Sequence, residues 1–289
     1  MTNIYIKQAH SDDEILWDEY VKQHPDATFF HLFGWKKALE MSFRHKNYYL
    51  YAYDGNAIVG VLPLGHIKSL LFGNTLISTP FAVYGGILAD NDEVKRILRD
   101  AACDLAKELK VDHLELRNIK RENPDWPTKE LYVYFKKDLA DSDDDNLKAI
   151  PRKQRAMVRK GIKAGLKTQV NTNIDPFFQA YSESVRNLGT PVFPKKLFQS
   201  LVAVFPGQLD ILSITKDDTL VASVMNFYFK DTVLPYYGGG TSSARFLKAN
   251  DYMYWSLMQH SAKKGIKQFD YGRSKEGTGS YSFKKNWGF

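Results

Sequence analysis

The residues best suited to chemistry lie near the C-terminal end of the chain. Asp270 follows an apolar segment over 266–269, a glycine-containing loop spans 272–279, and Lys284 lies beyond that loop. A lysine ammonium group can stabilise the oxyanion that forms when an amine attacks an ester or thioester. A nearby carboxylate can hold or deprotonate the attacking amine. Lys284 and Asp270 are therefore the candidate catalytic residues, and acyl transfer is the chemistry that they would serve.

The pattern around Lys284 predicts its local structure. Residues 281–285 alternate between aromatic and polar side chains, which predicts a strand beside a loop whose glycines allow close approach of a ligand. The glycine spacing imitates a phosphate-binding loop, but that motif requires lysine at the position of Thr278. A nucleoside triphosphate site of that kind is therefore excluded. From these residues alone, a C-terminal hairpin with a solvated pair of lysines is the alternative.

A basic segment near the middle of the chain is the second candidate site. Residues 147–167 contain eight basic residues and no acidic residue, directly after a segment rich in aspartate over 138–145. Pro151 suits the first turn of a helix. Three arginines at spacings of i, i+3 and i+7 would then share one face of it. A solvated linker helix is the alternative, but the absence of opposite charges favours a phosphate-bearing partner. The four residues assigned to that partner are Arg152, Lys153, Arg155 and Arg159.

The composition limits the class of protein. The chain has 289 residues, 44% of them hydrophobic, which is enough for a buried core in one large or two ordinary domains. A net charge of +7 is compatible with an anionic partner. Cys103 is the single cysteine, so an internal disulfide is excluded, and the histidines show no metal-binding spacing. We predict no metal and no cofactor. The sequence shows no signal peptide or membrane span, so we predict a cytoplasmic protein.

The predicted elements occur twice in the same order, which indicates an internal duplication. Each half reads as two helices, a β-hairpin, a strand that ends in glycines, a helix and a last strand. The expected ranges in the first half are 12–24, 35–39, 48–53, 58–64, 76–84, 92–109 and 111–117. Those in the second half are 174–188, 193–198, 209–214, 220–229, 232–237, 250–264 and 266–271. We infer an α/β fold of two mixed units with mainly antiparallel sheets, over residues 1–145 and 146–289.

Several motifs resemble the second half of Fem-type transferases, most nearly the FemAB-related type associated with exosortase (PEP-CTERM) systems. The basic stretch that begins at Pro151 resembles the helix that opens that half. The resemblance covers nearly the whole chain, although the first half matches mainly in pattern. The motifs that carry it are Tyr236-Tyr237-Gly238-Gly239, Ala249-Asn250, Trp255, Ala262, Gly265, Asp270-Tyr271-Gly272 and Phe283-Lys284-Lys285-Asn286-Trp287-Gly288-Phe289.

The resemblance implies two tandem GNAT-like (acyl-CoA N-acyltransferase) domains and acyl transfer to an amine. The donor would be aminoacyl-tRNA, and the acceptor a nucleotide- or lipid-linked precursor of peptidoglycan or exopolysaccharide. A lipid-linked acceptor would require peripheral contact with the inner membrane face. By position, Lys284 resembles the lysine that contacts the reacting ester of the donor. The residues assigned to substrate binding are Arg186, Tyr237, Lys36, Lys37 and Arg273.

Two departures from the family keep other interpretations open. The long helical arm of some Fem proteins is missing between 167 and 174, which favours an acyl-CoA or acyl-carrier-protein donor and an amino-sugar acceptor. Relatives usually continue with a strand after the Trp-Gly-Phe motif, so a truncated chain is one interpretation of an end at Phe289. A protein of a different class, which binds an anionic polymer without catalysis, is the third hypothesis.

Overall fold

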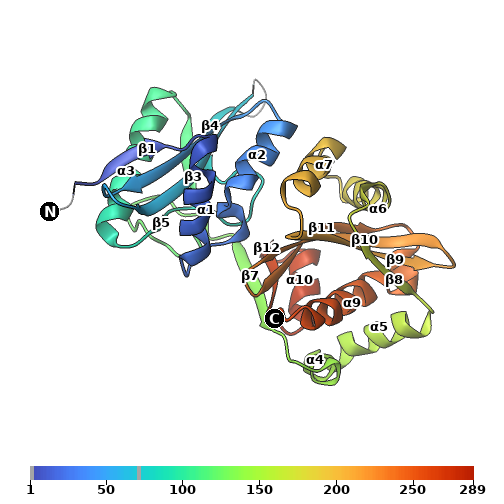
Figure 1. Ribbon diagram of the computed structural model, residues 1–289. Coiled ribbons are helices and arrows are strands. Elements are labelled where there is room, and N and C mark those ends of the chain that lie inside the picture. Colours follow the sequence, from blue (N-terminus) through green and yellow to red (C-terminus); the bar gives the residue numbers. More distant parts are fainter. Residues whose placement is uncertain (1–2, 70–72) are drawn as a thin grey trace. The chain divides into compact units, whose positions relative to one another are not determined.

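A computed structural model describes residues 3–69 and 73–289 of the chain (Figure 1). The chain divides into two compact units, Met1–Thr128 and Lys129–Phe289. The boundary that the sequence predicted, between 145 and 146, lies further along the chain than this division. Residues 132–138 form strand β7 (Tyr132–Asp138), which pairs with β12 (Gln268–Lys275) of the second sheet. The segment that joins the two repeats therefore belongs to the second unit.

The first unit is a mixed sheet with helices on it. Its strands follow the order β1-β2-β3-β4-β6, all antiparallel except β4 and β6, and β5 pairs with β3. Asn91 caps α3 by accepting a hydrogen bond from the Val94 amide, and the apolar face of α3 covers the sheet. The elements are β1 (Tyr5–Gln8), α1 (Glu14–Gln23), α2 (Phe33–Ser42), β2 (Lys46–Tyr53), β3 (Ile58–Ser69), β4 (Gly73–Ser78), β5 (Leu88–Ala89), α3 (Asp92–Glu108) and β6 (His113–Leu116), with short 3-10 turns at Ser11–Asp13 and Phe29–His31.

The second unit has the strand order β7-β12-β11-β10-β9-β8. Neighbouring strands are antiparallel except β11 and β12, which are parallel and pair only at Thr232–Gln268 and Val233–Phe269. Besides β7 and β12, its elements are α4 (Asp143–Ala149), α5 (Arg152–Lys163), β8 (Lys167–Asn171), α6 (Ile174–Asn187), α7 (Lys195–Val204), β9 (Leu209–Lys216), β10 (Thr219–Phe229), β11 (Thr232–Gly240), α8 (Ala244–Leu247), α9 (Ala249–Lys263) and α10 (Gly279–Asn286).

The predicted duplication is confirmed by the topology. The path β1-β2-β3-β4-β6 of the first sheet has the same order and directions as β8-β9-β10-β11-β12 of the second. In each unit two helices separate the first two strands, and a longer helix, α3 or α9, precedes the last, parallel strand. The expected α/β fold class with mainly antiparallel sheets is therefore correct.

Two predicted strands differ in the structure. The strand expected over 76–84 ends at Ser78, and residues 79–87 form a loop. The strand expected over 281–285 is instead part of helix α10. Thr278 caps this helix by accepting a hydrogen bond from the Tyr281 amide at 3.3 Å. Phe283 and Trp287 are four residues apart and face the same apolar core, as residues on one face of a helix do. The alternation over 281–285 had wrongly indicated a strand.

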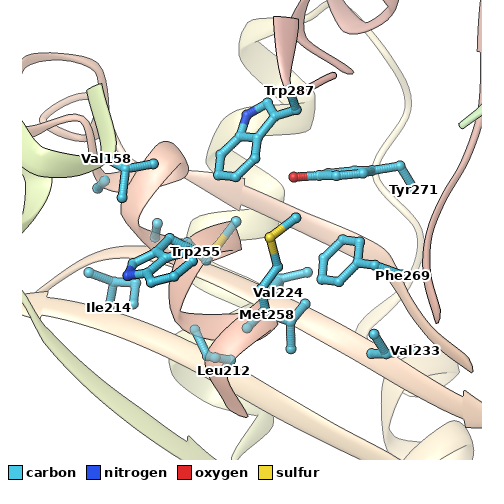
Figure 2. Packing of buried hydrophobic residues seen from close by; sticks show 14 of the residues in the cluster. Val158, Leu212, Ile214, Val224, Val233, Trp255, Met258, Phe269, Tyr271 and Trp287 are labelled. Atoms are coloured by element: carbon cyan, nitrogen blue, oxygen red, sulfur yellow. The ribbon is translucent and has the colours of Figure 1, made fainter. Parts of the chain in front are cut away.

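The core of the second unit surrounds the end of α10. Figure 2 shows Trp287 and Tyr271 above Met258 and Phe269, with Trp255 beside them on the same cluster. The Trp287 ring is fully buried and lies 6.2 Å from the rings of Tyr271 and Phe283. This packing holds α10 against the sheet.

Candidate active site in the second unit

Lys284 projects from α10 onto the backbone of β12. Its Nζ donates hydrogen bonds to the carbonyl oxygens of Tyr271 at 2.6 Å and Arg273 at 3.0 Å. The ammonium group also lies 5.9 Å from the centre of the Phe135 ring. Lys284 is therefore not the freely solvated residue of the alternative interpretation. Two of its three N–H donors are used within the protein, which leaves one for another group.

The backbone of β12 is shaped to receive this lysine. The pairing of β12 with β7 is irregular between Asp270 and Arg273, where Gly272 has a positive φ of 65°. The buried Asp270 carboxylate accepts the Gly272 amide at 2.6 Å and lies 3.4 Å from Nζ of Lys136. Because these contacts fix the irregular segment, the geometry supports a positioning role for Asp270. Its predicted part in holding or deprotonating an amine stays a prediction.

Burial changes the acid–base behaviour of Lys284. Removal from water lowers the pKa of Lys284 to about 8, and the negative charge of Asp270 opposes this by raising it. Near neutral pH the group is mostly charged, and it loses its charge within the accessible pH range. The arrangement offers one fixed cationic donor whose protonation state can be tested.

Tyr237 lies on β11 inside a cluster of aromatic rings. The rings of Tyr181, Phe198 and Tyr236 meet it edge-on at 6.0, 5.2 and 4.7 Å. Within the described chain its buried hydroxyl has no hydrogen-bond partner, and burial raises the pKa of Tyr237 well above its usual value. A buried hydroxyl without a partner is costly, so a substrate group that accepts from it would be favoured. The substrate-contacting role predicted for Tyr237 is compatible with this.

The guanidinium groups of the two other predicted substrate residues of this unit have surroundings of their own. Arg186 is exposed at the C-terminal end of α6, and among the described residues its guanidinium has no hydrogen-bond or ion-pair partner. Glu183, one turn earlier on the same helix, accepts the Ser242 amide at 2.7 Å. The Arg273 guanidinium stacks on the Tyr132 ring at 4.2 Å. The structure therefore brings Lys284 together with the backbone, and not the side chain, of Arg273.

The predicted phosphate-contacting lysines lie on α2 of the first unit. Nζ of Lys36 donates to the Ala9 carbonyl at 3.4 Å and lies over the Phe33 ring at 4.9 Å. Lys37 forms an ion pair with Glu14 at 3.0 Å. Both ammonium groups are therefore engaged within their own unit, and their phosphate-binding role stays a prediction.

The predicted basic helix exists as α5, and it presents a hollow of ≈ 440 Å³ along its outer face. Val158 and Gly161 are buried on the opposite face of the helix. Of the four predicted donor residues, three line the hollow, and Lys153 does not. The lining residues are Arg152, Arg155, Ala156, Arg159, Lys160 and Lys163. The concentration of positive charge suits several phosphate groups.

The sequence did not identify a buried acid where α5 meets α9. Asp251 is buried and accepts a hydrogen bond from Nε2 of Gln154. Removal from water raises the pKa of Asp251 to about 6, and the Gln154 hydrogen bond opposes this shift. In the sequence, Asp251 resembles an ordinary polar residue of a first helical turn, so only the packing of the two helices distinguishes it.

Asp251→Asn is expected to make the stability of the protein less dependent on pH. A pKa raised in the folded state favours folding of the protonated form, so this contribution is present below about pH 4 and lost as pH rises through about 6. As pH rises from about 4 to about 6, the free energy of unfolding of the variant should therefore increase relative to that of the wild type, by up to about 3 kcal/mol. Urea unfolding at a series of pH values measures it, with the exposed Asp144→Asn as control. A difference between wild type and variant that does not change with pH would contradict the assignment.

No group of three or more histidine, cysteine, aspartate or glutamate side chains in residues 3–69 and 73–289 could hold a metal ion. Among the helices of the same residues, none combines the length and the apolar character that crossing a bilayer demands.

Comparisons with known proteins agree with the duplicated fold. The family model described as an acetyltransferase (GNAT) domain matches residues 152–285. The fold is similar to the crystal structure of FemX, with a TM-score of 0.74 and 14% identity over 98% of this chain and 94% of that one. It is also similar to the C-terminal domain of a putative lysylphosphatidylglycerol synthetase from Agrobacterium fabrum, with a TM-score of 0.62 and 13% identity over 97% and 89% of the two chains.

A tandem GNAT protein from the clavulanic acid biosynthesis pathway has a TM-score of 0.59 and 11% identity, over 99% of this chain and 95% of that one. No curated protein sequence matches the chain. The predicted fold of two tandem GNAT-like domains is confirmed, and the resemblance to Fem-type transferases is confirmed at the level of the fold.

Proposed function

We propose, from the acetyltransferase (GNAT) domain that residues 152–285 form, that the protein transfers an acyl or aminoacyl group to an amine of a cell-envelope precursor. The observation that carries this proposal is the placement of Lys284. A partly buried ammonium group, fixed by the carbonyls of Tyr271 and Arg273, keeps one N–H for an incoming oxygen. A preorganised donor of this kind is what acyl transfer requires, because negative charge develops on the carbonyl oxygen under attack.

The proposed reaction is a direct transfer without a covalent enzyme intermediate. The neutral acceptor amine forms a bond to the carbonyl carbon of the donor, and the carbonyl oxygen gains negative charge. The free N–H of Lys284 donates to that oxygen. The bond to the leaving oxygen or sulfur then breaks, and the leaving group takes up the proton that the amine loses. Asp270 holds the β12 segment that presents Lys284.

The donor is proposed to be an ester or thioester whose phosphates lie in the hollow along α5. Arg152, Arg155 and Arg159 line one side of that helix at a spacing suited to successive phosphate groups. The phosphates of tRNA and of coenzyme A both fit this requirement. FemX and the lysylphosphatidylglycerol synthetase domain share the fold, which supports an aminoacyl donor and an envelope precursor as acceptor.

One structural observation favours acyl-CoA or an acyl carrier protein as the alternative donor, with an amino sugar as acceptor. Only residues 164–166 separate α5 from β8, so the chain has no helical arm at that point. The similar fold of a tandem GNAT protein from the clavulanic acid biosynthesis pathway also supports a donor of the acyl-CoA type.

A panel of donors tests the proposal. The purified protein is incubated with aminoacyl-tRNA, acyl-CoA or acyl carrier protein, together with nucleotide-linked and lipid-linked amine acceptors, and the acceptor mass is measured. An aminoacyl adduct supports the leading proposal, and an acyl adduct with acyl-CoA or the carrier protein supports the alternative. Salt-sensitive binding of tRNA or another polyanion with no product from any donor would overturn both and indicate a non-catalytic binding protein.

Arg159→Glu is expected to raise KM for the phosphate-bearing donor by about tenfold or more, because it replaces an attractive charge with a repulsive one in the hollow. The value of kcat should change little, since Arg159 does not contact the reacting atoms. Lys153→Glu makes the same change of charge on the same helix outside the hollow, so it is the matched control. Equal effects of the two variants on KM would indicate long-range attraction and not binding in the hollow.

A further inference from the structure

Exposed positive and apolar side chains occur together where α5 ends and α8 begins. In the last turn of α5 the exposed residues are Lys160, Ile162 and Lys163, and on α8 they are Arg245 and Phe246. Phe246 is 87% exposed, the largest fraction among the large hydrophobic side chains of the described residues. We call these five residues the basic–apolar surface. Single exposed apolar residues are common and indicate nothing by themselves, so it is their combination with positive charge that indicates an interaction site.

Helix packing brings the two parts of this surface together. A Cβ on Gly161 of α5 would lie 2.7 Å from Cβ of Tyr252 and 3.2 Å from the carbonyl oxygen of Lys248, both near the start of α9. At the other end, Asp143 of α4 accepts a hydrogen bond from Gln259 of α9 at 2.7 Å. The C-terminal end of α5 therefore lies against the start of α9, and Figure 1 shows the two helices side by side. Because α8 directly precedes α9, it lies beside the C-terminal end of α5.

The positive charges of this surface are not neutralised within the described chain. Neither Lys160, Lys163 nor Arg245 forms an ion pair there, and α5 itself contains no acidic residue. Exposed cations next to each other repel, and an external anionic surface relieves that repulsion. Phe246 and Ile162 add apolar area that gains free energy when it leaves water.

We propose that the basic–apolar surface docks the second unit on an anionic phospholipid bilayer. Phe246 and Ile162 enter the boundary between headgroups and acyl chains, while the lysines and Arg245 lie against lipid phosphates. Nucleic acid is the competing anionic partner. Nucleic-acid bases stack on aromatic rings such as that of Phe246, but they do not stack on an aliphatic side chain such as that of Ile162. The presence of Ile162 therefore favours the bilayer. Lys160 and Lys163 also line the hollow proposed for the donor phosphates, so docking is separated from acyl transfer through Phe246, which does not line that hollow.

Vesicle flotation tests the docking. Wild-type protein is expected to float with vesicles that contain phosphatidylglycerol and not with vesicles of phosphatidylcholine alone. Phe246→Ser should weaken binding roughly tenfold, because the apolar contact is lost. Leu188→Ser is the matched control, since Leu188 is also highly exposed, at 77%, but lies at the end of α6. The control should bind as the wild type does.

The double variant Lys160→Gln/Lys163→Gln should weaken vesicle binding roughly 30-fold at low salt, with an unchanged melting temperature. Wild-type protein that binds bulk tRNA but no vesicles would overturn the proposal in favour of a nucleic-acid surface. Equal vesicle binding by wild type and Phe246→Ser would overturn it as well. Turnover of Phe246→Ser with water-soluble substrates should stay unchanged, so loss of docking is distinguishable from failure of the acyl-transfer proposal.

Discussion

Lys284→Met is expected to lower kcat/KM for acyl transfer by about 10²–10³-fold, because it removes a fixed donor to the developing oxyanion. Methionine keeps most of the length and apolar character of the side chain. It leaves the carbonyl oxygens of Tyr271 and Arg273 without the Nζ donor, so the melting temperature of the variant is measured alongside. Lys285→Met is the matched control, because Lys285 is the adjacent lysine of the same helix and is exposed.

The pH dependence distinguishes a cationic role from a structural one. Since the pKa of Lys284 is lowered to about 8, the charged form is lost as pH rises through that value, and kcat/KM should fall above it. Lys284→Arg keeps a positive charge and N–H donors at every pH used, so this fall should be absent in the variant. A wild-type rate that continues to rise above pH 8 would show that the neutral amine, and not the cation, is the active form. Turnover of Lys284→Met equal to that of the wild type would remove the catalytic assignment.

Trp287→Ala is expected to reduce the free energy of unfolding by about 3–5 kcal/mol, as large-to-small changes at buried aromatic residues do. The Trp287 ring is fully buried against Tyr271, Phe283 and Tyr254. Because this ring anchors the end of α10, the variant should also lose activity through displacement of Lys284. Urea unfolding of wild type and variant gives the difference directly.

The control for this prediction is Phe246→Ala, which removes an aromatic ring of similar chemistry from an exposed position and should change stability by less than about 0.5 kcal/mol. Trp287→Phe refills much of the volume and should recover part of both stability and activity. An alanine variant as stable as the wild type would mean that α10 does not depend on this core. A stable alanine variant without activity would assign Trp287 a direct role at the site.

The duplicated fold was accessible from the sequence because its elements carry strong local signals. The apolar residues of α3 recur with a helical period, and a turn precedes β3, so the sequence itself shows where these elements begin and end. The same order of elements recurs in the second half. Strands β1 and β8 escaped prediction since nearly all their residues are exposed and show no apolar alternation. Strand β7 escaped because its partner, β12, lies more than 130 residues further along the chain.

The candidate site was predictable in its residue types and not in its geometry. The motif around Lys284 identified the lysine, but its acceptors are backbone carbonyls, which no sequence pattern marks. Their position depends on the irregular pairing between Asp270 and Arg273. The five-residue alternation over 281–285 was too short to separate a strand from a helix, and burial of Trp287 decided the outcome. The basic helix α5 was predicted correctly because Pro151 and the run of charges are signals within the helix itself and need no distant partner.

Strand β7 determines whether the second unit could be produced alone without an exposed β12 edge. A fragment that began at residue 146 would leave the outer backbone groups of β12 unpaired along the register from Gln268 to Lys275. Such a bare edge is a template on which strands of separate molecules join and aggregate. A fragment that began at Lys129 would end the sheet with β7 instead, and Lys136 and Lys137 on that strand place charge at the edge, which discourages such pairing. The connecting segment thus covers the edge of β12 and limits self-association, and it belongs to the second unit.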